Sequence, residues 1–127
     1  MFAKRPNHME LKMKKLLLIA FCLIGANAWA GNCSKTSNSF EIEQCMAESV
    51  KSLKAKLNKT YNKVYTQTEA KPQLDAAQKA WITYRDLQCA DFVDADSNHS
   101  PASNSISLAC QTDLISQRID YLKSLQE

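Results

Sequence analysis

Apolar side chains recur at steps of three and four residues along three stretches of the chain, the spacing of one face of an α-helix. The first stretch, about 39–66, carries Ile42, Cys45, Met46, Val50, Leu53, Leu57, Tyr61 and Val64. The second, about 72–92, carries Leu74, Ala77, Trp81, Tyr84 and either Leu87 or Gln88. The third, about 103–125, carries Ile106, Cys110, Leu114, either Arg118 or Ile119, Leu122 and Leu125. The pattern predicts three amphipathic helices.

Helix-starting and helix-breaking residues set the ends of these stretches. Asn38 is a candidate N-cap, and Glu41 three residues later gives a spacing that resembles a capping box. Pro72 and Pro101 fall between the apolar stretches, and proline fits a first helical turn but breaks a helix interior. The segment 94–102 is polar and rich in Asp, Ser and Asn, which is typical of an exposed loop.

Glycine is missing from most of the chain. The two glycines are Gly25 and Gly31, so residues 32–127 contain none. Phosphate-binding loops, dinucleotide fingerprints and nucleophile elbows need a residue without Cβ, and these sites are therefore excluded there. Tight two-residue hairpins also depend on glycine, which disfavours a β fold. We predict an all-α fold, a small antiparallel three-helix bundle.

The first thirty residues have the organisation of a secretory signal peptide. Met13-Lys14-Lys15 is a short basic start, residues 16–26 are apolar, and Ala28-Trp29-Ala30 is a small-x-small cleavage site. The apolar run is about 11 residues, against the roughly 20 that a membrane-spanning helix needs. We expect residues 1–30 to be a signal peptide, with Met13 as an alternative start. Residues 31–127 are then a periplasmic or secreted domain without a membrane span.

Removing this leader reverses the sign of the net charge. The whole chain has a formal charge of +3, whereas residues 31–127 carry 11 Lys+Arg and 12 Asp+Glu, a net charge of −1. A nucleic-acid partner thereby loses its electrostatic support. Cys22 also falls in the leader, after the bulky Phe21, which disfavours the alternative of a lipidated cysteine. The first helical stretch is expected to present a solvated basic face, formed by Lys51, Lys54, Lys56, Lys59 and Lys63.

Four cysteines remain after the leader: Cys33, Cys45, Cys89 and Cys110. An even number in an exported domain of this size indicates two disulfides. Zinc is the alternative, but no two cysteines are closely spaced, and His99 is the only histidine after the leader. Of the three possible pairings we favour Cys33 with Cys45 and Cys89 with Cys110. Each closes a short loop and should contribute roughly 3 kcal/mol to stability.

An ordered set of residues resembles a known family. Cys33, Glu41 and Cys45 are followed by Leu57-Asn58 with Tyr61, by the pattern AQxAWxxYRDxxC at 77–89, and by Cys110, Arg118 and Leu122. This order is similar to the lysozyme-inhibitor LprI-like family of exported bacterial proteins, over residues 33–125. The resemblance implies a helical envelope domain and, for some members, inhibition of lysozyme. The chain departs from the family's pattern at 97–103, where the family often has glycine and serine, and at Asn38, where it often has Thr.

The resemblance makes a protein partner, a lysozyme or another cell-wall hydrolase, the leading hypothesis. Lysozyme uses two carboxylates in a cleft and is usually cationic, so an inhibitor needs hydrogen-bond donors for the cleft and acidic groups around them. The segment 94–102 offers both, with donors at Ser97, Asn98, His99 and Ser100 and steering charges at Asp94 and Asp96. The alternatives are a periplasmic immunity-type protein against a delivered toxin, and a structural envelope module that inhibits no enzyme.

Other polar residues are interpreted as structural: Arg85, Asp86, Glu41 and Arg118. Arg85 lies one helical turn from Trp81, and a partly buried guanidinium needs a carboxylate. We expect that carboxylate from one of Glu41, Glu48 and Asp113.

Catalysis and metal binding have little support in the sequence. Asp94, Asp96 and Asn98 imitate the first ligands of a calcium loop, but glycine is missing at its sixth position and Ser105 stands at its twelfth. A nucleophile needs a base within reach, and the cysteines are assigned to disulfides. We therefore expect no enzyme activity, no metal and no cofactor.

Overall fold

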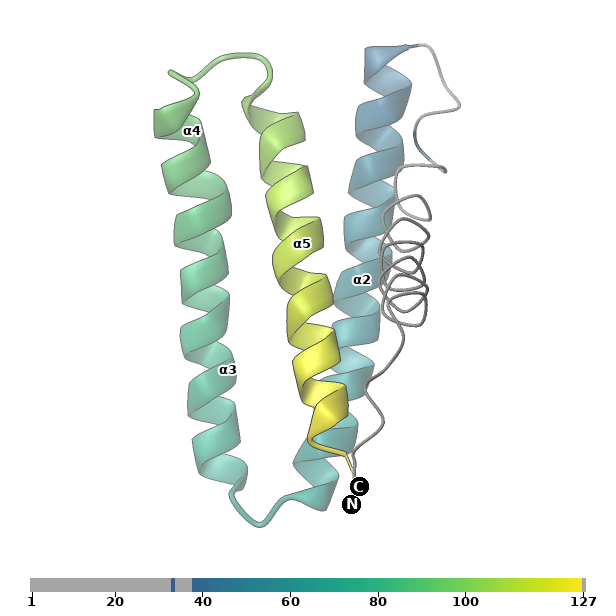
Figure 1. Ribbon diagram of the computed structural model, residues 1–127, viewed down its shortest axis with the longest axis vertical. Coiled ribbons are helices and arrows are strands. Elements are labelled where there is room, and N and C mark those ends of the chain that lie inside the picture. The colour runs from purple at the N-terminus through teal and green to yellow at the C-terminus, as the bar shows by residue number, and fades with distance from the viewer. Residues whose placement is uncertain (1–32, 34–37, 127) are drawn as a thin grey trace, which may run out of the picture. The chain divides into compact units, whose positions relative to one another are not determined.

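The computed structural model describes Cys33 and residues 38–126, and the helices from Ser39 onward form one compact unit. Three rods make up this unit (Figure 1). The first is α2 (Ser39–Gln67) and the last is α5 (Ser103–Ser124). The middle rod begins with α3 (Lys71–Asp86) and continues through a π-helical turn, η1 (Leu87–Phe92), into the short α4 (Val93–Asp96). The prediction of an all-α, antiparallel three-helix fold is confirmed.

Short polar connections join the rods where the sequence predicts breaks. Pro72 lies in the first turn of α3, where its missing N–H costs no hydrogen bond. The turn before it is held by Thr68, whose carbonyl accepts from Lys71 Nζ at 2.9 Å. The second connection is shorter than expected: helix continues to Asp96, so the predicted loop at 94–102 begins only at Ser97. Nothing between Phe92 and Asp96 breaks a helix, which explains the extra turn.

The core lies mainly between α2 and α5, whose backbones approach each other most closely. It consists of Val50, Leu53, Leu57 and Val64 from α2 and Leu108, Ile115, Ile119 and Leu122 from α5. The predicted stripe of the first helix is therefore confirmed in its central part. The stripe of the third helix is partly wrong, because Ile106 and Leu125 are exposed while Leu108 and Ile115 are buried.

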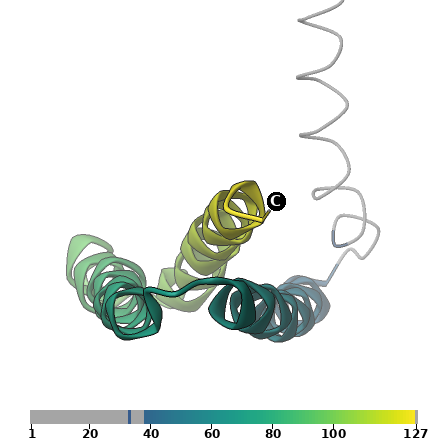
Figure 2. The same cartoon turned by 90° about the horizontal axis from the view of Figure 1, so that it is seen from below.

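The middle rod, which we call the α3 arm (Lys71–Asp96), stands further from the other two. Its closest backbone approach to α5 is at η1 and α4, whereas α3 itself approaches α2 and α5 at few points. The end view in Figure 2 shows the three rods at the corners of a triangle. Leu74 and Trp81 of α3 are half-buried and pack against the core formed by α2 and α5.

The π turn changes which side chains of the α3 arm face inward. Positions spaced by four, Trp81, Arg85, Cys89 and Val93, all lie at least half-buried. In a regular α-helix such steps would drift around the axis, but the wider π turn keeps them on one face. The predicted stripe is wrong at Ala77 and Tyr84, which are exposed; of the two alternatives at its end, Leu87 is exposed and Gln88 is half-buried.

Candidate functional site

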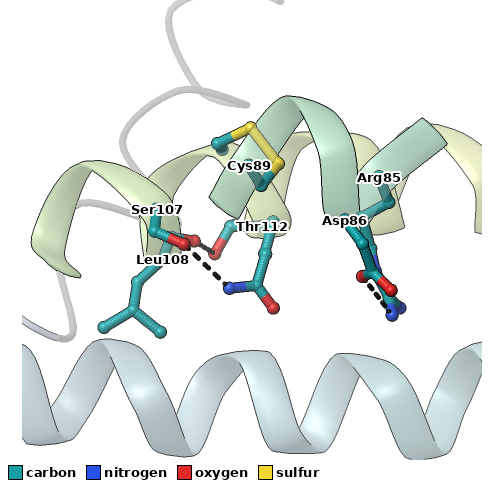
Figure 3. The surroundings of a disulfide bond; sticks show 8 residues. Arg85, Asp86, Cys89, Ser107, Leu108 and Thr112 are labelled. Carbon is teal, nitrogen blue, oxygen red and sulfur yellow. Dashed lines mark hydrogen bonds and ion pairs between the residues drawn. A yellow bond between two sulfur atoms is a disulfide. The ribbon is translucent and has the colours of Figure 1, made fainter. Parts of the chain in front are cut away.

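A disulfide fastens the upper end of the α3 arm to α5 (Figure 3). It joins Cys89 and Cys110, whose Cα atoms lie 5.4 Å apart, as the favoured pairing predicts. Cys89 is buried at the contact. Cys33 and Cys45 are disulfide-bonded as well, and their pairing with each other stays a prediction for peptide mapping.

The chain leaves α4 through a turn, Ser97–Ser100, that has a defined backbone. The His99 N–H donates to the Asp94 carbonyl at 2.9 Å and the Asn98 N–H donates to the Ala95 carbonyl at 3.2 Å. These are the two hydrogen bonds of a Schellman motif. Asn98 and His99 have φ angles of 53° and 54°, in the left-handed region that non-glycine residues enter at a cost of about 1 kcal/mol each. The turn thus holds a conformation that usually calls for glycine.

The side chain of Asp94 ties this turn to α5. Its Oδ2 lies 2.5 Å from His99 Nδ1, and its Oδ1 accepts a hydrogen bond from the Ser103 hydroxyl at 3.0 Å. These two partners lower the pKa of the Asp94 carboxyl below its ordinary value of 3.8. Ser97 is turned toward the same residue, donating to the Asp94 carbonyl at 3.3 Å. Asp94 therefore holds the turn in place.

An open hollow lies beside this turn, between the end of the α3 arm and the start of α5. Its lining is largely polar: Ala90, Asp91, Asp94, Ser100, Pro101, Ser103, Asn104 and Ser107. Asn104 also donates to the Glu43 carboxylate of α2, which connects the start of α5 to the first rod. Such a surface suits the hydrogen-bonding side chains of a protein partner better than an apolar ligand.

A second polar cluster fills the space between α3 and α5. Arg118 Nε donates to Oε1 of the buried Gln78 at 2.9 Å. The guanidinium carbons of Arg85 and Arg118 lie 5.5 and 5.9 Å from the Trp81 ring centroid, within the range of cation–π attraction. Burial lowers the pKa of Arg118 from its ordinary value. Polar and aromatic contacts here replace the aliphatic packing found between α2 and α5.

The carboxylate partner of Arg85 differs from the expected ones. Its guanidinium pairs with the adjacent Asp86 at 3.0 Å (Figure 3), and not with Glu41, Glu48 or Asp113, so that expectation is wrong. The Arg85 side chain is only 14% exposed, but it reaches the helix surface, where Asp86 is the carboxylate at hand. Asp86 is itself solvent-exposed, so the pair adds little to stability, about 1 kcal/mol or less.

The predicted partner-binding residues gather at one end of the unit. Asp94 and Asp96 lie in α4 rather than in a loop, which corrects their predicted placement. Asn98 and His99 are exposed at the turn, and Ser100 is half-buried beside them. The Ser97 hydroxyl donates its hydrogen bond within the turn, to the Asp94 carbonyl. The sequence pattern does not predict that Gln78 accepts from Arg118 or that Ser103 donates to Asp94, because spacing along the chain does not show which residue of another helix is the partner.

Two further properties of the described residues bear on function. None of their helices combines the length and the apolarity that crossing a bilayer requires. No three or more of their His, Cys, Asp and Glu side chains are grouped so that they could hold a metal ion.

These features define a small helical protein whose described cysteines are all oxidised and whose polar turn is fixed at one end. Residues 30–122 match the family model described as lysozyme inhibitor LprI, and the chain belongs to this family. It is also similar to an uncharacterized protein of Rhizobium meliloti (strain 1021), with 30% identity over 131 residues that cover 88% of this chain and 92% of the relative. No solved structure matches the chain.

Proposed function

We propose that this protein is an exported lysozyme inhibitor that inserts the turn Ser97–Ser100 into the catalytic cleft of its target. The family description supports the inhibitor function at the level of the family. Oxidised cysteines support an oxidising compartment outside the cytoplasm. The predicted signal peptide, residues 1–30, lies outside the described residues and is part of the proposal.

The observation that carries the proposal is the set of contacts that order the turn. Two backbone hydrogen bonds fix the end of α4, the Asp94 carboxylate links the turn to Ser103, and the Cys89–Cys110 disulfide fastens the two supporting helices. A binding segment that is already ordered loses less conformational entropy when it binds. The strained φ angles of Asn98 and His99 fit this interpretation, because strain of this kind persists where function uses the geometry.

The chemistry of the turn suits a cleft with two carboxylates. Asn98, His99 and Ser100 provide an amide, an imidazole and a hydroxyl, all of which donate hydrogen bonds to carboxylate oxygens. Ser97 is left out of this set, since its hydroxyl is engaged by Asp94. The exposed Asp96, next to the turn, attracts a cationic enzyme without entering the cleft.

The test is inhibition of c-type, g-type and i-type lysozymes in a turbidity assay, together with binding kinetics at two ionic strengths. The variant His99→Ala/Ser100→Ala should weaken binding by about tenfold or more, because both side chains sit where the cleft would close. Asp96→Asn should mainly slow association and flatten its dependence on salt. Circular dichroism establishes that each variant is folded.

Two results would contradict the proposal in different ways. Absence of inhibition of all three lysozyme classes at micromolar concentration removes the inhibitor function for this protein. If the wild type inhibits a lysozyme and both variants inhibit it equally well, the partner is correct but the turn is not the binding surface. Ala102→Ser, an exposed change just beyond the turn, is the matched control and should bind like the wild type.

A further inference from the structure

The α3 arm carries three large, exposed apolar side chains that the turn does not explain. Tyr84, Leu87 and Phe92 are 52%, 54% and 56% exposed, and we call these three residues the apolar flank. They are separated by three and five positions. The steps of four from Trp81 to Val93 stay on the inward face, so Tyr84 and Phe92, eight positions apart, lie along one line of the rod, and Leu87 lies about a quarter turn to the side of this line.

The apolar flank differs from the other exposed apolar residues of the unit. Single exposed leucines or isoleucines are normal on protein surfaces, whereas a contiguous apolar patch marks an interaction site. The other exposed large apolar residues are distributed over α2, α3, α5 and the end of α5: Phe40, Tyr65, Ile82, Ile106, Tyr121 and Leu125. The apolar flank combines two aromatic residues and a leucine on one rod, and large side chains of this kind anchor protein interfaces.

Charge along the same rod points to the kind of partner. From Asp86 to Asp96 the chain has four aspartates, Asp86, Asp91, Asp94 and Asp96, and no lysine or arginine. The exposed side of α2 instead carries the five lysines Lys51, Lys54, Lys56, Lys59 and Lys63. A cationic protein is therefore attracted to the part of the α3 arm from Asp86 to Asp96 and repelled from the lysine side of α2.

The size of the turn also calls for additional contact area. A stable interface buries about 800 Å² on each partner, more than four residues at a helix end supply. Phe92 lies five positions before Ser97 and Tyr84 lies thirteen before it. At about 1.5 Å rise per residue, the apolar flank extends the turn by roughly 20 Å along the arm.

From these observations we infer that the apolar flank is the second half of the lysozyme-binding surface, packing on the cationic surface beside the cleft while the turn enters it. This inference rests on the proposed function and adds to it the residues that supply most of the binding energy. The aspartates next to the flank, above all Asp91, then face basic side chains of the enzyme.

The experiment measures binding of the wild type and of flank variants to the lysozyme that the wild type inhibits most strongly, using protein purified from the periplasm of an expression host. Leu87→Gln and Phe92→Gln should each raise Kd by about tenfold or more, because each removes a central apolar anchor. Ile82→Gln and Ile106→Gln are the controls: both residues are apolar and lie off the flank, they are 38% and 46% exposed, and their replacement should leave Kd unchanged. Glutamine is a good helix former, so the rods should be preserved, and thermal melts check this.

The outcomes separate this inference from the proposed function. If the wild type inhibits a lysozyme and both flank variants bind it with unchanged Kd, the flank is not part of the binding surface and the turn alone remains. Absence of binding to every lysozyme tested overturns both. A second copy of the chain is the competing occupant: if sedimentation finds a wild-type dimer that Leu87→Gln dissociates, the flank is a self-association surface and the inference is wrong.

Discussion

The α2–α5 pair and the α3 arm are held in the same unit by different forces. Between α2 and α5 the contacts are aliphatic, and Ile115 and Leu122 are fully buried there. Burying a side chain of this kind contributes about 1.5–3 kcal/mol. The α3 arm buries few large apolar residues and relies on the half-buried Leu74 and Trp81, on directional polar contacts and on a disulfide.

The polar contacts of the α3 arm extend along its length. Near its start the Tyr61 hydroxyl of α2 donates to Asp75 at 3.2 Å, and Asp75 also pairs with Lys79 at 2.9 Å. Near its end Asp94 bonds Ser103 of α5. Such contacts fix orientation but bury little area, so the arm should open locally before the α2–α5 pair does. The α2–α5 pair thus supplies most of the stability, while the α3 arm presents a surface.

The largest effect is expected from truncation inside the α2–α5 pair. Ile115→Ala should lower the free energy of unfolding by about 2–5 kcal/mol, because it leaves a cavity in a fully buried layer. Urea unfolding followed by circular dichroism measures the change. Ile106→Ala, on the same helix but exposed, is the control and should stay within about 0.5 kcal/mol of the wild type. A loss below about 1 kcal/mol for Ile115→Ala would mean that the core lies elsewhere.

Removing the Cys89–Cys110 disulfide should act on the arm more than on the pair. The variant Cys89→Ser/Cys110→Ser frees a segment of 21 positions and should cost about 3 kcal/mol. Hydrogen exchange should accelerate in α3 and η1 more than in the centre of α2. The exposed neighbours Ala90 and Ala109 give a matched control, Ala90→Ser/Ala109→Ser. Equal acceleration in all three rods would contradict a separately held arm.

Trp81 should have a smaller effect, since it is only half-buried. Trp81→Ala is expected to cost about 2 kcal/mol, less than the 3–5 kcal/mol typical of a fully buried tryptophan. Trp81→Phe keeps an aromatic face for Arg85 and Arg118 and should recover about half of this loss. Both values come from urea unfolding. If the phenylalanine variant is no more stable than the alanine variant, the cation–π contacts carry none of the difference.

The sequence predicts the helices well but not how the middle one is oriented. Proline, the N-cap candidate and apolar spacing place the helix ends within a few residues, because these signals act locally. For the α3 arm, the predicted stripe runs through Tyr84, whereas the structure buries Gln78 on a neighbouring face, and apolar spacing alone is compatible with either orientation of the helix. The π turn and the hydrogen bond from Arg118 to Gln78 select the observed orientation, and the spacing of apolar residues predicts neither of them.

The candidate site shows a similar division. Its composition marks residues 94–102 as polar, and the Cys89–Cys110 pairing follows from loop length. The Schellman turn is harder to foresee, since it is closed by Asn98 without a glycine. The role of Asp94 depends on Ser103, nine positions away on another helix, so that local reasoning treats it as a free charge.

The smallest expected effect concerns the Asp94 joint between the α3 arm and α5, and it depends on pH. Hydrogen bonds from His99 and Ser103 lower the pKa of the Asp94 carboxyl below 3.8 in the folded protein. A carboxyl with a lowered folded pKa stabilises the fold above its unfolded pKa of about 3.9, and this contribution disappears as the pH falls through the folded value. Asp94→Asn should therefore melt at a lower temperature than the wild type at pH 7, and the two melting temperatures should converge below about pH 4.

Asp96→Asn removes a charge from the same turn of helix without touching His99 or Ser103, and it serves as the control. A difference between Asp94→Asn and the wild type that stays constant from pH 7 to pH 3 would mean that the ionised carboxylate does not hold the joint.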